Sequence, residues 1–144
     1  MPRAPKPYDI VLYGPTGFVG RQTVAYLAAH KDVQASGLRW AIAGRNRAKL
    51  EALQRELQVP HAGVLVADAA DTAALDTLAR SARVVLSTAG PFALYGTPLV
   101  EACVRHGCHY VDITGETPWV KGLIERLHTR AAQQHTRIIP CCGF

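Results

Sequence analysis

The chain has 144 residues, a formal net charge of +5 and 49% hydrophobic residues. This length is typical of one domain that buries a core without disulfides or metals, and no apolar run approaches the length that crosses a bilayer. The basic residues are scattered rather than gathered in a block. The charge therefore fits an anionic cofactor and gives no reason to expect nucleic acid as a partner.

Two short features bear on processing and redox state. Residues 1–7 contain three prolines and no apolar run, so we expect a flexible lead-in rather than a secretory signal. The cysteines Cys103, Cys108, Cys141 and Cys142 lack the paired spacing of a zinc site, and two of them are adjacent. We therefore expect buried free thiols in a reducing cytoplasm, and no metal.

Short apolar runs alternate with longer stretches of helical period along the whole chain, a pattern typical of βαβ units around a parallel sheet. Most of the short runs are almost continuously apolar, as expected for strands that helices cover on both faces. The predicted strands are residues 9–13, 39–43, 63–67, 84–87, 110–113 and 137–141, and the predicted helices are residues 18–30, 47–57, 72–82, 97–106 and 119–134.

A glycine-rich turn joins the first predicted strand to the first predicted helix. Gly14 permits a tight turn, Gly17 lets the backbone approach a pyrophosphate, and Gly20 lets the helix pack close to the sheet. Free N–H groups at the start of that helix would then face the phosphates, although a purely structural turn is the alternative. The predicted phosphate-binding residues are Gly14, Thr16, Gly17, Phe18, Val19 and Gly20.

The residues after the second strand indicate which dinucleotide is bound. An NAD-binding domain usually has an acidic residue here, which holds the ribose 2′-hydroxyl, whereas this chain has Gly44, Arg45 and Asn46. A guanidinium can bind a 2′-phosphate with paired hydrogen bonds, so Arg45 predicts NADP(H). Asn46 could cap the next helix and also touch that phosphate. The alternative is that Arg45 is simply a solvated loop residue.

Two further segments follow the third and fourth strands. Asp68 could cap the next helix or bind the adenine amino group, and the presence of Asp71 as a cap favours the second role. Small residues after the fourth strand would leave room for the pyrophosphate and the nicotinamide ribose, although the Gly-Pro pair among them also suits an ordinary turn. These predicted residues are Ser87, Thr88, Ala89, Gly90, Pro91 and Phe92.

These features together predict an α/β fold with a doubly wound parallel sheet of about six strands, the Rossmann fold. We expect a single domain over residues 8–144, with strand order 3-2-1-4-5-6 and an NADP(H) site across the carboxyl edge of the sheet.

Four stretches of the chain resemble the NADP-binding domain of saccharopine dehydrogenase-like oxidoreductases. They are residues 14–20, 43–50, 87–96 and 110–116, within a match over residues 8–144. The resemblance implies that the matched glycines, Arg45 and residues 88–92 bind NADP(H). It also implies a second domain after residues 142–144, absent from this chain, which supplies substrate contacts and the surface of a homodimer.

The resemblance leaves the small-molecule substrate open. Some members are similar to saccharopine reductases, which act on an imine, and others to reductases of enoyl lipid intermediates, so the expected reaction is hydride transfer to an imine, enoyl or carbonyl group. Asp112 and Glu116, at the end of the fifth strand, could orient the substrate or cap the following helix.

Three alternatives share the glycine turn. A short-chain reductase needs a Tyr-x-x-x-Lys pair, which this sequence lacks. A phosphorylating aldehyde dehydrogenase would use Cys141 or Cys142 as a nucleophile, but no partner base is evident beside them. A redox-sensing module would bind NADP(H) without turning it over, and steady hydride transfer by the intact protein would distinguish an enzyme from such a module.

Overall fold

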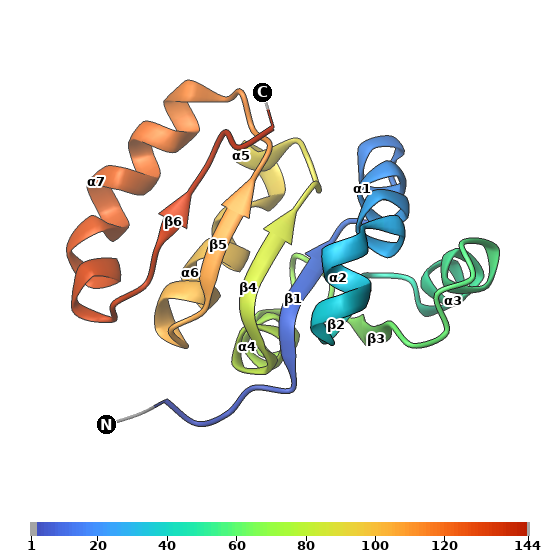
Figure 1. Ribbon diagram of the computed structural model, residues 1–144. Helices are drawn as coiled ribbons and strands as arrows, with labels where there is room; N and C mark the ends of the chain where they lie inside the picture. Colours follow the sequence, from blue (N-terminus) through green and yellow to red (C-terminus); the bar gives the residue numbers. More distant parts are fainter. Residues whose placement is uncertain (1–2, 144) are drawn as a thin grey trace.

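Six parallel strands form one sheet in the order β3-β2-β1-β4-β5-β6, which confirms the predicted doubly wound topology (Figure 1). The structure is a computed structural model that describes residues 3–143. The strand order reverses between β1 and β4, so the crevice expected at this switch point opens at their carboxyl ends. The strands are β1 (Tyr8–Tyr13), β2 (Trp40–Gly44), β3 (Gly63–Val66), β4 (Ala82–Ser87), β5 (His109–Asp112) and β6 (Ile138–Ile139).

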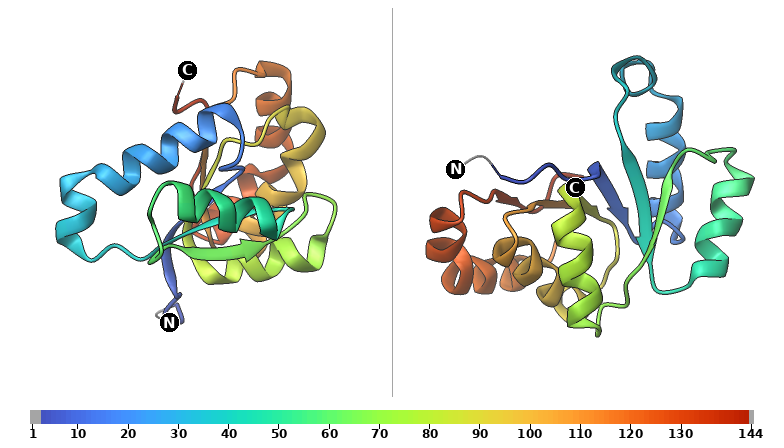
Figure 2. Two further views of the ribbon diagram at one scale, coloured as in Figure 1. Left: turned by 90° about the vertical axis from the view of Figure 1, so that its right-hand side faces the viewer. Right: turned by 90° about the horizontal axis from the view of Figure 1, so that it is seen from below.

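Helices lie on both faces of the sheet, as Figure 2 shows. One face carries α1 (Phe18–Ala29), α2 (Lys31–Ser36) and α3 (Arg47–Glu56), whose apolar side chains pack with β1 and β2. The other face carries α4 (Thr72–Ser81), α6 (Thr97–Arg105) and α7 (Thr117–Gln133). The remaining short helix, α5 (Phe92–Tyr95), lies at the carboxyl edge.

Each central strand feeds two hydrophobic cores because successive side chains point to opposite faces. In β1, Val11 and Tyr13 belong to the larger core under α4, α6 and α7, whereas Leu12 belongs to the smaller core under α1 and α3. This double burial explains why the strands read as continuous apolar runs rather than as alternating ones.

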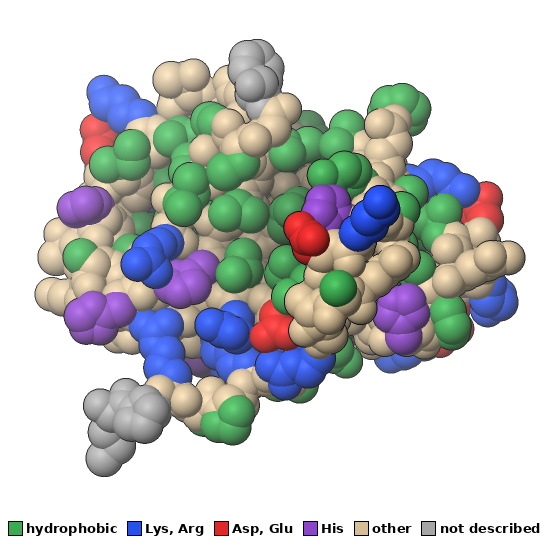
Figure 3. Space-filling model, viewed as in Figure 1, with side chains coloured by type: hydrophobic (Ala, Val, Ile, Leu, Met, Phe, Trp, Pro, Cys, Tyr) green, Lys and Arg blue, Asp and Glu red, His purple; other side chains and the backbone are tan. Residues whose placement is uncertain are grey.

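One half of the sheet is covered on a single face. In β4, β5 and β6, the side chains of Val84, Val111 and Ile139 alternate with residues of the larger core, so they point to the opposite face. No described helix lies over them in Figure 1, and Figure 3 shows hydrophobic side chains gathered there. Ile139 is 48% exposed. This apolar half-face is unusual, because parallel sheets are normally covered on both sides.

The boundaries of the predicted strands and helices lie within two residues of those in the structure, and two short helices were missed. The helices α2 and α5 were not predicted, since each is too short to show a helical period. The last strand was predicted over residues 137–141 but comprises Ile138–Ile139, because Pro140 has no N–H to donate and Cys141 has a left-handed φ of 64°. Helix α7 begins at Thr117, two residues early, since Pro118 is well tolerated in a first turn.

The described part of the lead-in is held to the domain, because Lys6 Nζ donates hydrogen bonds to the carbonyl oxygens of Ala79 (3.0 Å), Ala82 (2.7 Å) and His106 (3.3 Å). Met1 and Pro2 lie outside the described residues, as does Phe144.

The expectation of buried free thiols holds for two cysteines and is wrong for the other two. Cys103 and Cys108 are free and buried, whereas Cys141 and Cys142 are exposed, because the last strand ends before them. None of the helices in the described part of the chain combines the length and the hydropathy needed to cross a membrane.

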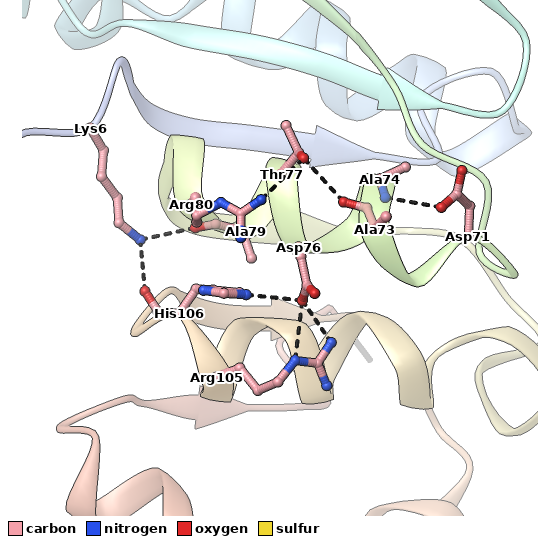
Figure 4. A network of polar contacts seen from close by, with 10 residues as sticks. All are labelled: Lys6, Asp71, Ala73, Ala74, Asp76, Thr77, Ala79, Arg80, Arg105 and His106. Carbon is pink, nitrogen blue, oxygen red and sulfur yellow. Dashed lines mark hydrogen bonds and ion pairs between the residues drawn. The ribbon is translucent and has the colours of Figure 1, made fainter.

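A partly exposed ion pair joins α4 to α6, which pack side by side (Figure 4). Asp76 Oδ1 accepts hydrogen bonds from Arg105 Nη2 (2.7 Å) and Nε (3.1 Å), and His106 Nε2 lies 3.0 Å from the same oxygen. The hydrogen bonds from Arg105 lower the pKa of the Asp76 carboxyl. The ion pair therefore contributes stability above the ordinary pKa of an aspartate, near 4, and loses it as the pH falls through the lowered value of the folded state.

The variant Asp76→Asn should lower the free energy of unfolding at pH 7 by about 1–2 kcal/mol, because it weakens two charge-assisted hydrogen bonds. Urea denaturation at pH 7 and near pH 2 measures this, and the difference from the wild type should shrink at the acid pH. The control is Glu125→Gln, whose carboxylate is 64% exposed and lies 3.8 Å from Lys121. An equal loss in both variants, or a loss unchanged at acid pH, would contradict the assignment.

Candidate cofactor site

A cavity of about 390 Å³ lies at the carboxyl edge of the sheet, where the turns after β1, β2, β3 and β4 meet. A second groove of about 330 Å³ runs along α7 and contains none of the predicted site residues. Within residues 3–143, no group of three or more His, Cys, Asp or Glu side chains is placed to hold a metal ion. The cavity at the sheet edge is lined by Tyr13, Gly14, Thr16, Gly17, Gly44, Arg45, Asp68, Ala69, Thr88, Ala89, Gly90 and Tyr95.

The first wall is the glycine turn, where three glycines play three roles. Gly14 has a φ of 84°, and a Cβ on it would lie 2.8 Å from the Cβ of Ala89. A Cβ on Gly20 would lie 2.1 Å from the carbonyl oxygen of Gly14, so this glycine allows α1 to approach the turn. A Cβ on Gly17 would meet nothing closer than 3.8 Å, which leaves space on the cavity side. The turn thus fits a ligand that approaches the backbone at Gly17.

The N-terminus of α1 is open to an anion. Its N-cap residue Gly17 makes no side-chain cap hydrogen bond, and its first turn has no acidic residue. By contrast, Asn46 caps α3 by accepting a hydrogen bond from Lys49 N (3.1 Å), and Asp71 caps α4 in the same way. The free N–H groups of α1, at the positive end of its dipole, are suited to hold phosphate oxygens.

The second wall carries the charges of the cavity. Arg45 is exposed and follows β2, and no carboxylate among the described residues forms an ion pair with it. Arg47 instead lies 3.6 Å from Glu51, on the surface of α3. Asp68 accepts a hydrogen bond from Ala70 N (2.8 Å) and so shapes its own turn, although it also lines the cavity. Arg45 is therefore available to a ligand phosphate.

The third wall is the turn after β4, and it is hydrogen-bonded to the first. Thr88 Oγ1 donates to the carbonyl oxygen of Gly14 (2.9 Å), and Thr88 N donates to that of Tyr13 (2.9 Å). Ala89 and Gly90 follow on the cavity side. These bonds fix the distance between the two turns that meet at the switch point.

Nine of the sixteen predicted site residues line the cavity, and seven do not. Gly20 packs under the turn, Asn46 caps α3, and Phe92 is buried with its ring centroid 5.7 Å from that of Trp119. A contact of any of the seven with a cofactor remains a prediction. The seven are Phe18, Val19, Gly20, Asn46, Ser87, Pro91 and Phe92.

Three lining residues were not predicted, namely Tyr13, Ala69 and Tyr95. Tyr13 ends β1 and donates from its hydroxyl to the carbonyl oxygen of Ala67 (3.1 Å), and burial raises the pKa of Tyr13 to about 12. Its position directly before Gly14 was the signal that could have identified it. Tyr95 belongs to α5, which the sequence pattern did not reveal.

The two acids at and after the end of β5, Asp112 and Glu116, hold backbone segments rather than capping the next helix. Buried Asp112 accepts hydrogen bonds from the hydroxyl of Tyr110 (2.8 Å) and from the N–H groups of Thr114 and Cys141 (both 3.0 Å). Burial and this carboxylate raise the pKa of Tyr110.

Glu116 stands at the N-cap position of α7 without capping it. Instead, its carboxylate accepts hydrogen bonds from the N–H groups of Phe92 (2.6 Å) and Ala93 (3.2 Å), at the start of α5. Glu116 therefore positions α5, which carries the lining residue Tyr95, whereas the partners of Asp112 lie outside the lining of the cavity.

The variant Gly20→Ala should lower the free energy of unfolding by about 1–3 kcal/mol, because its methyl group would overlap the Gly14 carbonyl and push α1 away from the turn. Helix propensity alone would favour alanine at this position. The matched control is Gly122→Ala in α7, where a Cβ meets nothing within 4 Å, and it should be neutral or slightly stabilising. Urea denaturation compares the two, and similar effects would contradict the packing role of Gly20.

The comparisons with known proteins agree with this geometry. Residues 10–139 match the family model of the saccharopine dehydrogenase NADP binding domain. A trans-acting enoyl reductase from Mycobacterium leprae is 44% identical over 140 residues, covering 95% of this chain and 32% of that protein. A lipid droplet localized protein from Caenorhabditis elegans is 38% identical over 143 residues, covering 95% of this chain and 33% of that protein. The chain thus spans about a third of these relatives.

A solved structure shows the same fold. Apo saccharopine dehydrogenase (L-Glu forming) from Saccharomyces cerevisiae superposes with a TM-score of 0.74 at 20% identity, covering 94% of this chain and 27% of that one. The family model covers most of the chain, from β1 to β6. The chain therefore belongs to the saccharopine dehydrogenase NADP binding domain family, and its cofactor is NADP(H).

Proposed function

We propose that this chain is the cofactor-binding domain of an NADPH-dependent reductase in which Arg45 selects NADP(H) over NAD(H). The observation that carries the proposal is one cavity with an uncapped helix N-terminus on one wall and an unpaired guanidinium on another. A diphosphate and a ribose 2′-phosphate are the two anionic groups of NADP(H), and the two walls match them.

Each wall of the cavity has a defined task in this proposal. Amides at the start of α1 hold the diphosphate, and Gly17 leaves room for it. Arg45 holds the 2′-phosphate with charge-assisted hydrogen bonds. Thr88, Ala89 and Gly90 lie on the β4 side, where the nicotinamide ribose would pass. The bound cofactor supplies a hydride, and the protein residues fix its position.

The reaction that we propose is reduction of an activated double bond. Relatives named trans-acting enoyl reductases, such as that of Mycobacterium leprae, support an enoyl substrate over an imine or a carbonyl. An enoyl substrate gains a hydride at one carbon of the double bond and a proton at the neighbouring carbon. Neither Asp112 nor Glu116 is the proposed donor of that proton, because both carboxylates accept hydrogen bonds from backbone N–H groups.

The whole enzyme would contain further polypeptide, as the longer relatives do. The apolar half-face of β4, β5 and β6 supports this proposal, since a covering domain would remove its side chains from water. Such a domain would supply substrate contacts and the surface of a homodimer. The buried free thiols of Cys103 and Cys108 support a reducing compartment, and hence a cytoplasmic location.

NADPH should raise the melting temperature of this chain more than NADH does. A ligand that binds only the folded state adds about 2.7 kcal/mol at a concentration of about 100 times its Kd. The variant Arg45→Ala should weaken NADPH binding about tenfold or more and leave NADH binding unchanged, because NADH has no 2′-phosphate.

A thermal-shift titration with both cofactors measures this. The matched control is Arg55→Ala, which removes an arginine in the last turn of α3, outside the cavity. Equal stabilisation of the wild type by NADH and NADPH would refute the role of Arg45.

A further inference from the structure

Helix α5 presents two large apolar side chains to solvent beside the cofactor cavity. Leu94 is 71% exposed, and Tyr95 is 51% exposed and lines the cavity. On the same helical turn, Phe92 points inward and is only 6% exposed. On the α1 side of the cavity, Gly17 is followed by Phe18, which is 84% exposed. Exposed apolar side chains thus belong to, or directly adjoin in the chain, residues that line the cavity.

The exposure of α5 is not the result of a loosely held loop. The Glu116 carboxylate binds the first N–H groups of α5, and the buried ring of Phe92 packs on Trp119. Trp119 Nε1 in turn donates a hydrogen bond to Thr97 Oγ1 (2.9 Å), at the start of the next helix. A Cβ on Gly96 would lie 2.7 Å from the Trp119 ring, so the chain after α5 also packs tightly on this indole. A firmly anchored turn therefore holds Leu94 and Tyr95 outward.

The charges of the cavity lie at its other end. Arg45 and Asp68 follow β2 and β3, whereas the β4 side has neutral residues up to Tyr95. The strand order places β2 and β3 on one side of β1 and β4 on the other. The carboxylate of Glu116, which contacts α5, accepts hydrogen bonds from backbone N–H groups, and so does that of Asp112 at the end of β5. The described residues that line this end of the cavity, Thr88, Ala89, Gly90 and Tyr95, thus carry no charge.

We propose that Leu94 and Tyr95 form an acyl-chain seat, a surface that determines specificity by packing against the apolar chain of the substrate. The inference rests on the proposed function, because it takes the β4 side of the cavity as the nicotinamide end. The acyl-chain seat favours a substrate with an apolar acyl chain over an amino-acid imine. An amino-acid imine would need cationic partners for its carboxylates, whereas an apolar acyl chain needs only side chains such as these.

The acyl-chain seat predicts that the affinity of the protein for an acyl substrate increases with the length of the acyl chain. Each methylene that becomes fully buried contributes about fourfold in affinity, and a partly covered chain contributes less. Enoyl pantetheine thioesters of four, eight and twelve carbons, roughly spanning the seat, should therefore bind progressively more tightly, by about tenfold or more from the shortest to the longest.

The experiment measures the Kd of each thioester by calorimetry, with this chain alone and with NADPH present. In Leu94→Ser and Tyr95→Ser, the gain in affinity with chain length should fall to about threefold or less. The matched control is Ile124→Ser, which removes an apolar side chain that is 59% exposed on α7, and it should retain the full gain. Circular dichroism spectra and melting curves of all variants verify that each is folded.

The outcomes separate the seat from the proposed function. No gain in affinity with chain length, or an equal loss of it in Ile124→Ser, would overturn the acyl-chain seat even if NADPH binds well. Chain-length-dependent binding that is lost in the α5 variants but occurs without any NADPH binding would overturn the proposed function, and would leave α5 as an apolar binding surface that no longer determines the specificity of a reductase. A gain in affinity with acyl-chain length that disappears in Leu94→Ser and Tyr95→Ser but not in Ile124→Ser would support the acyl-chain seat.

Discussion

The rest of the site depends on one constraint, the close approach of three backbone segments. These segments are the turn after β1, the start of α1 and the turn after β4. Gly14 and Gly20 permit it because a Cβ on either would overlap its neighbours, and Thr88 fixes it with hydrogen bonds to the β1 turn. The cavity and the open N-terminus of α1 both result from this contact. Any side chain that separates these segments would change the position of every group that faces the cofactor.

The cavity has two chemically different ends, because strands on opposite sides of β1 supply them. The β2 and β3 side provides Arg45 and Asp68, whereas the β4 side provides small residues and then the exposed apolar side chains of α5. The phosphate groups of NADPH are charged and its reduced nicotinamide ring is neutral, so this division agrees with the proposed order of groups along the cofactor. The carboxylate of Glu116, in the loop after β5, holds the start of α5 through hydrogen bonds to its N–H groups.

Much of this could be predicted from the sequence because the signals are local. The strand and helix alternation, the glycine turn and Arg45 are recognised from residues that are adjacent in the chain. The strand order was then predicted from the fold class that this alternation indicates. By contrast, α5 is one turn long and is held by Glu116 and Trp119, which come more than twenty residues later. The tasks of Asp112 and Glu116 could not be predicted either, since their partners are brought to them by the packing of other segments.

The sequence by itself was sufficient to predict the class of fold, the glycine turn after β1 and NADP(H) as the cofactor, because backbone freedom at glycine and the charge of a guanidinium are properties of single residues. Only the tertiary structure decided which of the predicted residues face the cavity, that Tyr13 and Tyr95 join them, and that the acids after β5 serve the backbone. The physical reason is that the exposure and the hydrogen bonds of a residue depend on which distant segments pack against it, and the sequence of one segment does not contain that information.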